Sequence, residues 1–303
     1  MNSNIPNLIL MIRPKHFGFN EQTAGSNSFQ HQSSDDVSII AQQEFDGMVE
    51  VLRSKEIDVK VFEDQEIVLP DSVFPNNWIS NFPKEALVIY PMLTPNRRDE
   101  VREDVIEWAL QALMLDEFID LTMAQEEDRI LEGTGSVVFD HASKTAFASV
   151  SPRTDLSLLK DLCDNMGYET VSFEAVDLNG DQIYHTNVVM SIGSQVTIIC
   201  LESIPDLLER AMVKRSLEKI GKEIIEITYN QMNQFAGNAY EVINKQGKHF
   251  YAMSSTAYNA LNEVQKAVVS SSMEILSISI PTIEKVGGGS VRCMMAGLFN
   301  YPK

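Results

Sequence analysis

Apolar residues recur at helical spacing in five stretches of the chain, which predict helices over residues 37–53, 99–113, 154–166, 205–220 and 256–270. A short run rich in β-branched and aromatic residues follows each helix and predicts strands at 59–62, 118–121, 169–173, 223–228 and 275–280. Further strand-like runs precede the next helix, at 8–12, 86–90, 137–139, 188–192, 196–201 and 239–243. The helix starts lie about 50 to 60 residues apart, which indicates a repeated unit of one helix and three strands.

Two architectures fit this repeat. Five equivalent α/β units can bury their strands against one another in a closed ring, and no flexible linker separates them, so residues 1–303 are expected to form one domain. Alternating helices and strands more often form a doubly wound parallel sheet. In that architecture a glycine-rich phosphate loop is expected near the end of a strand. The sequence contains neither a G-x-G-x-x-G nor a P-loop signature, but the pattern alone leaves both architectures open.

The excess of acidic over basic residues makes nucleic acids and anionic membranes unfavourable partners. Asp and Glu number 43 against 24 Lys and Arg, and the net charge of −19 repels phosphate backbones and anionic lipids. No apolar run reaches the roughly 18 residues that cross a bilayer, and the beginning of the chain lacks the features of a signal peptide. Three cysteines without staple-like spacing fit a reducing compartment. We therefore expect a cytoplasmic protein with no nucleic acid or membrane partner, and a surface that still permits a specific homodimer.

The glycine-rich segment 287–293 (GGGSVRC) is the first candidate for chemistry. Consecutive glycines let backbone N–H groups approach a ligand or a developing oxyanion, and Cys293 follows them as a candidate nucleophile. Most free cysteines are instead small buried hydrophobic residues. We accept that interpretation for Cys163 and Cys200, which lie within a predicted helix and a predicted apolar strand.

A nucleophilic thiol needs a base and usually a carboxylate as well. Among five histidines, only His185 lies between turn residues and the start of an apolar strand, with Asn187 two positions further on. Side chains at i and i+2 of a strand share a face, so these two residues are expected to enter one pocket. Glu132 lies in a glycine-flanked turn before another strand. A structural histidine and a plain turn are the simpler alternatives for these segments.

Two further segments carry polar residues in turns. Residues 74–79 (FPNNWI) hold Asn77 beside one of only two tryptophans, although an Asn pair after proline is commonly just a turn. Arg153 precedes a predicted helix, where the helix dipole disfavours a cation, and this placement hints at an anionic partner. The spacing of His and Cys residues gives no zinc-like cluster, so we expect neither a metal nor another cofactor.

Taken together, these segments resemble the amidinotransferase and arginine deiminase superfamily, whose pentein fold consists of five ββαβ units in a pseudo-fivefold propeller. The resemblance extends over nearly the whole chain and is closest to the citrulline-utilisation hydrolases. It rests on the motifs Arg13-Pro14, Asn76-Asn77-Trp78, Glu132-Gly133-Thr134-Gly135 and His185-Thr186-Asn187, followed by Cys293 near the C-terminus.

The resemblance implies a role for each matching residue. Cys293 would be the nucleophile, His185 the proton donor and acceptor, and Glu132 the carboxylate that holds the substrate nitrogens. Arg153, in a pattern similar to the family's S-x-R-T, would pair with a substrate α-carboxylate through two parallel hydrogen bonds. The residues carried over as further substrate-binding candidates are Arg13 and Asn238.

Two departures from the family pattern bear on the substrate. Arginine deiminases typically have aspartates where this chain has Asn77 and Asn187. Two carboxylates suit a guanidinium cation, whereas amides offer a donor and an acceptor to a group that has both N–H and C=O. The two asparagines therefore favour a neutral ureido group, with citrulline as the main candidate, although Glu132 leaves one carboxylate that can serve a cation.

The expected reaction is hydrolysis of citrulline to ornithine, CO2 and ammonia through a thiocarbamate on Cys293. An arginine deiminase or dihydrolase is the alternative with the same chemistry. A pentein that binds such an amino acid without turnover is the alternative from a different class.

Overall fold

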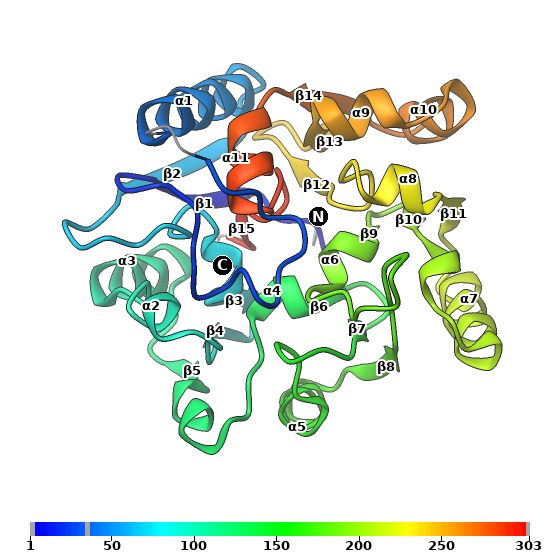
Figure 1. Ribbon diagram of the computed structural model, residues 1–303, viewed down its shortest axis with the longest axis horizontal. Helices are drawn as coiled ribbons and strands as arrows, with labels where there is room; N and C mark the ends of the chain where they lie inside the picture. Colours follow the sequence, from blue (N-terminus) through cyan, green and yellow to red (C-terminus); the bar gives the residue numbers. More distant parts are fainter. Residues whose placement is uncertain (1–3, 34–36, 301–303) are drawn as a thin grey trace.

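The computed structural model describes residues 4–33 and 37–300, and in this part of the chain the strands form five separate three-stranded sheets. The sheets are arranged around a common centre with the long helices on the outside, as Figure 1 shows. Each sheet belongs to one ββαβ unit. The predicted pentein fold is therefore confirmed. The doubly wound alternative is wrong, because none of these sheets gathers strands from several units.

Within a unit, the first two strands pair antiparallel, and the third returns after a helix to pair parallel with the second. Four units follow the chain in order: β3 (Ile79–Phe82), β4 (Ala86–Ile89) and β5 (Phe118–Asp120); β6 (Val137–Asp140), β7 (Thr145–Ser149) and β8 (Glu169–Phe173); β9 (Met190–Ile192), β10 (Val196–Ile199) and β11 (Glu223–Glu226); β12 (Tyr240–Ile243), β13 (His249–Ser254) and β14 (Glu274–Ile278).

The fifth unit joins the two ends of the chain. Strand β15 (Ala296–Leu298) pairs antiparallel with β1 (Leu8–Arg13), and β1 pairs parallel with β2 (Asp58–Glu63). This pairing closes the ring. It also anchors the turn before β15, which carries Cys293, to the first strand of the chain.

The long helices that cover the units are α1 (Ser38–Ser54), α3 (Glu103–Leu113), α5 (Leu156–Met166), α7 (Leu207–Lys219) and α10 (Glu263–Ser270). The shorter helices and 3₁₀ turns are α2 (Pro95–Arg98), α4 (Gly133–Ser136), α6 (Thr186–Val189), α8 (Tyr229–Met232), α9 (Ser255–Ala260), α11 (Pro281–Gly287), η1 (Pro75–Asn77), η2 (Thr122–Glu127) and η3 (Leu201–Ser203). In the described part of the chain, none of these helices has the length and apolar character needed to span a membrane.

Three predicted boundaries differ from the structure. The helix predicted at 99–113 begins at Glu103, because residues 95–98 form the separate short helix α2. The helix predicted at 256–270 is two helices, since the Asn262 side chain accepts a hydrogen bond from the Gln265 backbone N–H and caps a new helix. The strand predicted at 188–192 begins at Met190, because residues 186–189 form the helical turn α6.

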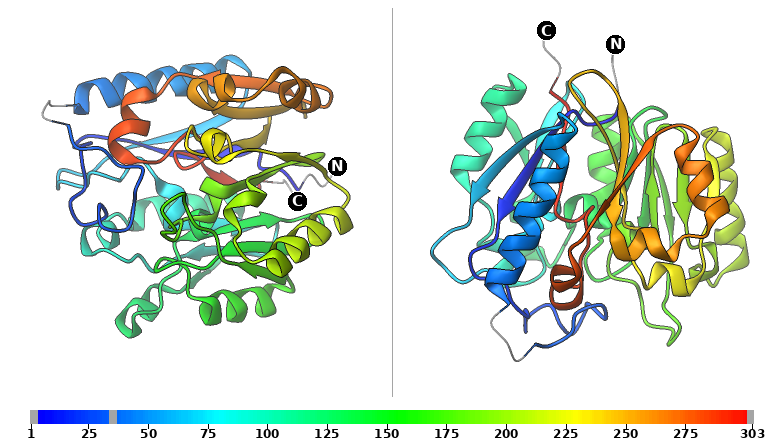
Figure 2. Two further views of the ribbon diagram at one scale, coloured as in Figure 1. Left: turned by 45° about the vertical axis from the view of Figure 1, so that its right-hand side comes forward. Right: turned by 90° about the horizontal axis from the view of Figure 1, so that it is seen from above.

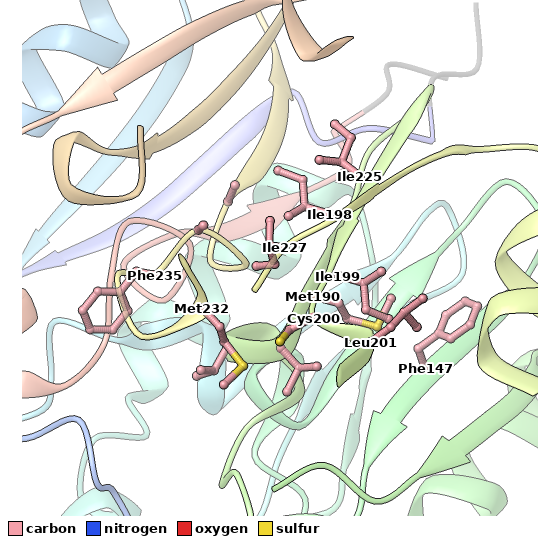
Figure 3. Packing of buried hydrophobic residues seen from close by; sticks show 14 of the residues in the cluster. Phe147, Met190, Ile198, Ile199, Cys200, Leu201, Ile225, Ile227, Met232 and Phe235 are labelled. Atoms are coloured by element: carbon pink, nitrogen blue, oxygen red, sulfur yellow. The ribbon is translucent and has the colours of Figure 1, made fainter. Parts of the chain in front are cut away.

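The core lies between the sheets and the helices that cover them. Figure 3 shows part of it, in which Ile198 of β10 and Ile225 of β11 belong to one cluster with Met232 of α8. Cys200 is fully buried in this cluster and Cys163 is buried on α5, as the sequence predicted for both. Burial raises the pKa of Cys200 to about 11, so this thiol stays protonated at neutral pH.

Residues 14–33, which follow β1, lie beside α11 at one end of the molecule (Figure 2, right). The Asn27 side chain donates a hydrogen bond to the Gly287 carbonyl at 3.4 Å, and the His31 backbone N–H donates to the Lys285 carbonyl at 2.8 Å. These contacts hold the segment over the end of the ring where the polar turns described next converge.

Candidate active site

Turns that precede the first strand of each unit converge near the centre of the ring (Figure 1). They supply Asn77 in η1, Glu132 before α4, His185 before α6, Asn238 before β12 and Cys293 before β15. All five side chains are buried. The repeat explains this convergence, because equivalent turns of five similar units face the same central space. The structure thus brings together residues that are separated by up to about 200 positions in the chain.

Cys293 lies against two amide side chains. Its sulfur accepts hydrogen bonds from Asn238 Nδ2 at 3.3 Å and from Asn187 Nδ2 at 3.5 Å, and only 4% of the residue is exposed. The Arg292 backbone N–H donates to Asn238 Oδ1 at 3.1 Å, which turns the amide nitrogen of Asn238 toward the sulfur. Two N–H donors aimed at one sulfur are an arrangement that suits a negatively charged thiolate.

His185 forms the second half of the centre. Its Nε2 lies 2.8 Å from Glu132 Oε2, so the neutral ring donates its Nε2–H to the carboxylate and keeps a lone pair on Nδ1. The turn before β6 must contain glycine here, because a Cβ on Gly135 would lie 2.7 Å from the His185 ring. The glycine of the Glu-Gly-Thr-Gly motif therefore makes room for the histidine.

The strand argument for His185 and Asn187 is wrong, although both residues reach the site. His185 has an extended backbone and precedes α6, and Asn187 lies within that helical turn. Their side chains therefore do not share the face of a strand. The turn instead presents His185 to Glu132 and Asn187 to the sulfur of Cys293.

Glu132 is fully occupied by partners from the protein. Its Oε2 accepts hydrogen bonds from His185 and from Arg153 Nη1 at 3.2 Å, and its Oε1 accepts one from the Leu93 backbone N–H at 3.1 Å. Burial opposes its ionisation, but Arg153 and His185 together hold the pKa of Glu132 well below its usual range. These contacts favour a role for Glu132 in orienting His185, and the role that the resemblance implied, holding the substrate nitrogens, stays a prediction.

Arg97 is part of the site, and the sequence patterns did not single it out. Its Nη1 donates to Asn77 Oδ1 at 2.8 Å. Its Nε and Nη2 donate to the two carboxylate oxygens of Glu100 at 2.9 and 2.8 Å. Because an arginine can only donate, the hydrogen bond from Nη1 fixes the Asn77 amide with its oxygen toward Arg97. The Nδ2 of Asn77 is buried and has no hydrogen-bond partner among the described residues.

Asp71 is a second residue of the site that the sequence analysis missed. Its Oδ2 accepts hydrogen bonds from Asn20 Nδ2 at 2.7 Å and from the Thr23 hydroxyl at 3.2 Å. Its Oδ1 is buried without a partner in the described part of the chain. Burial raises the pKa of Asp71, and Arg97 acts in the opposite direction. No periodicity or glycine pattern distinguished this residue from an ordinary loop aspartate.

Arg153 links the site to the segment that covers it. Its Nη2 donates to the Ser26 hydroxyl at 2.7 Å, and its guanidinium lies 4.8 Å from the centre of the Tyr184 ring. Its Nε has no partner among the described residues. The cavity lined by Arg153, Asp71, Asn77 and Cys293 has a volume of only about 10 Å³.

Arg13 is not brought to this cavity. It ends β1 with its side chain on α1, where Nε and Nη2 donate to the carboxylate of Asp46 at 2.7 and 2.8 Å. Glu63 lies 3.6 Å from the same guanidinium. We therefore do not retain Arg13 as a substrate ligand.

The triple glycine contributes both to packing and to the wall of the cavity, which Gly287 and Gly289 line. The Gly288 N–H already donates to the Glu284 carbonyl at 3.0 Å, so it is not a free oxyanion donor as the sequence suggested. Gly288 ends α11 in the left-handed conformation, with φ of +67°, which favours glycine. A Cβ on Gly289 would lie 2.8 Å from the Phe74 ring, so an aromatic side chain fills the space that this glycine leaves.

The titration of His185 predicts a pH-dependent stability. Burial lowers the pKa of His185 to about 4, although Glu132 acts in the opposite direction. Between about pH 6.5 and 4 the unfolded chain binds a proton that the folded protein does not, so this contribution to stability is complete above pH 6.5 and is lost on acidification. The loss is up to about 3 kcal/mol. Urea unfolding of the wild type and of His185→Asn should show a shallower decline in the variant.

His249 provides a control of opposite sign. A hydrogen bond to Glu241 raises the pKa of His249, so its contribution to stability is lost as the pH rises. His249→Asn should therefore leave the acid decline in place. Equal slopes for the wild type and His185→Asn between pH 6.5 and 4 would contradict a buried neutral His185.

Comparison with known families identifies the chain. A family model described as N,N dimethylarginine dimethylhydrolase, eukaryotic, matches residues 13–300. The chain belongs to this family. The predicted pentein superfamily is confirmed. A search of curated proteins found no match.

Solved structures share the fold at low sequence identity. The N-terminal domain of ArgZ, an arginine dihydrolase from cyanobacteria, bound to its substrate, has a TM-score of 0.73 at 16% identity over 96% of this chain and 98% of that chain. AgrE with ornithine and NAD+ has a TM-score of 0.76 at 16% identity over 99% of this chain and 40% of its own length. DDAH from Pseudomonas aeruginosa with citrulline has a TM-score of 0.66 at 14% identity over 97% and 99%. The chain spans only 40% of the length of the ArgZ chain in the apo structure.

Proposed function

We propose that this protein hydrolyses the ureido group of citrulline and releases ornithine, CO2 and ammonia through a covalent intermediate on Cys293. The observation that carries the proposal is the amide of Asn77. Arg97 occupies its oxygen, its buried NH2 group has no hydrogen-bond partner among the described residues, and Asn77 is one of the residues that line the cavity. A ureido carbonyl can accept a hydrogen bond from this group, whereas a guanidinium has donors only and would leave it unpaired.

Asp71 complements Asn77. Its free Oδ1 can accept a hydrogen bond from a ureido N–H, so the cavity offers one donor and one acceptor to the substrate. Glu132 no longer argues for a cation, because both of its oxygens are already engaged. Arg153 remains the candidate for the α-carboxylate, since it lines the cavity and its Nε is unpaired among the described residues.

The reaction follows from these positions. The Nδ1 of His185 takes the thiol proton, and the sulfur of Cys293 attacks the ureido carbon. The carbonyl oxygen becomes an oxyanion that Asn77 Nδ2 can stabilise. His185 then protonates the leaving nitrogen, and the C–N bond breaks to leave a thiocarbamate. Water, deprotonated by His185, releases the sulfur and yields a carbamate that decomposes to CO2 and an amine or ammonia.

An arginine dihydrolase is the second candidate. It is favoured by the buried carboxylate of Asp71, whose unpaired oxygen suits a guanidinium N–H as well as a ureido one. Two enzymes that share the fold, ArgZ and DDAH, carry names that refer to arginine or dimethylarginine. The two candidates differ in the group that Asn77 has to face.

The deciding experiment measures ornithine and ammonia release from citrulline and from arginine under the same conditions. We expect ornithine from citrulline and little turnover of arginine. Asn77→Asp removes the N–H donor and should lower kcat/KM for citrulline by about 10- to 100-fold, because a good donor to a developing oxyanion has at least this effect. The same change should raise the ratio of arginine to citrulline turnover.

Asn76→Asp is the matched control. Asn76 is adjacent and equally buried, but it does not line the cavity, and its amide donates to Thr134. It should change the substrate ratio little. Faster hydrolysis of arginine than of citrulline by the wild type would overturn the ureido assignment. Binding of citrulline in a calorimeter without any ammonia release would instead favour a pentein without turnover.

A further inference from the structure

A second cavity lies behind the loop that carries the nucleophile. It has a volume of about 50 Å³ and shares none of its described lining residues with the cavity that contains Cys293. Arg292 lines this second cavity, and Cys293, the next residue, lines the first. Asn187 stands between the two, because it lines the second cavity and donates to the sulfur of Cys293.

Arg292 is a buried cation without a counter-charge. It is 7% exposed, and its guanidinium stacks 3.7 Å from the centre of the Tyr240 ring. Its Nη1 donates to the Met295 carbonyl at 2.9 Å. Within residues 4–33 and 37–300 its Nε and Nη2 have no hydrogen-bond partner and it forms no ion pair, and neither atom is fully buried.

The two carboxylates that line the same cavity are committed elsewhere. Asp140 pairs with Lys222 at 3.4 Å and accepts a hydrogen bond from the Ser143 hydroxyl at 2.6 Å. Glu241 accepts a hydrogen bond from the Ser194 hydroxyl at 2.7 Å and pairs with His249. Neither carboxylate neutralises Arg292, so the free edge of the guanidinium is left to an occupant of the cavity.

We infer that this cavity binds a small planar oxyanion of the carboxylate or carbonate type. The residue lies in the cavity wall, and neither Nε nor Nη2 is a fully buried atom, so an anion in the cavity can pair with this guanidinium. The edge formed by Nε and Nη2 presents two parallel N–H groups, which match two oxygens of a planar anion. The cavity has room for more than a single water molecule, which suits an ion the size of formate or bicarbonate. The site needs no assumption about the substrate of the enzyme.

Thermal unfolding of the full chain in sodium formate, against sodium chloride at equal ionic strength, tests the inference. The wild type should show an unfolding temperature that rises with the logarithm of the formate concentration, by about 5 °C when formate exceeds its Kd a hundredfold. Bicarbonate in sealed cells should act in the same way, whereas pivalate, a bulkier carboxylate, should not. Arg292→Gln should abolish the rise. Arg53→Gln, which removes an exposed arginine of α1, should behave as the wild type does.

A second variant and a direct binding measurement test the inference if Arg292→Gln fails to fold. Arg292→Lys keeps the charge and the aliphatic stem but offers no two-pronged donor, and it should weaken formate binding at least about tenfold. Binding is followed directly by the line width of ¹³C-labelled formate in the presence of the wild type. A rise in unfolding temperature that persists in both Arg292 variants, an equal rise with pivalate, or no line broadening with the wild type would each overturn the inference.

Discussion

Replacing Cys293 with serine is expected to lower turnover by at least about 10³-fold while leaving the unfolding temperature nearly unchanged. The sulfur lies against two amide N–H donors in a buried turn, so the smaller and much less acidic hydroxyl keeps the packing but loses the nucleophile. Single-turnover and steady-state ammonia release, together with calorimetric unfolding, measure both effects.

Cys200→Ser is the matched control for this variant. Cys200 is also fully buried, but it lies in the apolar cluster of Figure 3. A hydroxyl there is expected to lower the free energy of unfolding by about 1–3 kcal/mol and to leave kcat nearly unchanged. Turnover retained in Cys293→Ser, or lost equally in Cys200→Ser, would contradict a nucleophilic Cys293.

Glu132→Gln is expected to have the largest combined effect on stability and activity. The change removes the charge that pairs with Arg153 and the acceptor that orients His185. An uncompensated buried guanidinium should lower the free energy of unfolding by about 3–5 kcal/mol. The loss of an oriented base should lower kcat by about 10²- to 10⁴-fold. Denaturant unfolding and the pH profile of kcat measure the two losses.

Glu241→Gln separates the two effects. Glu241 is as deeply buried as Glu132 and also pairs with a histidine, but its partner is His249, which does not line the cavity of Cys293. It should destabilise the protein with a much smaller effect on kcat. If Glu132→Gln left kcat within a few fold of the wild type, Glu132 would be a structural partner of Arg153 and not the residue that orients the catalytic base.

The amino-acid sequence predicted the fivefold repeat and the order of the candidate site residues along the chain. Helix-forming and strand-forming runs depend on local spacing of apolar side chains, so five units emerged before any contact was known. The predicted boundaries of helices and strands are wrong at places where local structure interrupts the pattern of apolar residues. Asn262 caps a second helix inside one predicted helix, and a helical turn replaces the start of the strand after His185.

The candidate site was predicted in part. Cys293, His185, Glu132 and Asn238 do lie together, because the repeat places them in equivalent turns. Arg13 matched a motif but faces Asp46 on α1, and no sequence pattern reveals where a long side chain at a strand end will point.

By itself, the sequence determined the α/β units, their number, and the residue types available for thiol chemistry, since these depend on local periodicity and composition. Tertiary structure alone decided which polar atoms are satisfied. Arg97 turns the Asn77 amide, and Asp71 contributes an unpaired oxygen, although neither residue carries a signal in its own neighbourhood. Hydrogen-bond satisfaction is a property of atoms that meet across the fold, and it governs both the proposed substrate and the vacant edge of Arg292.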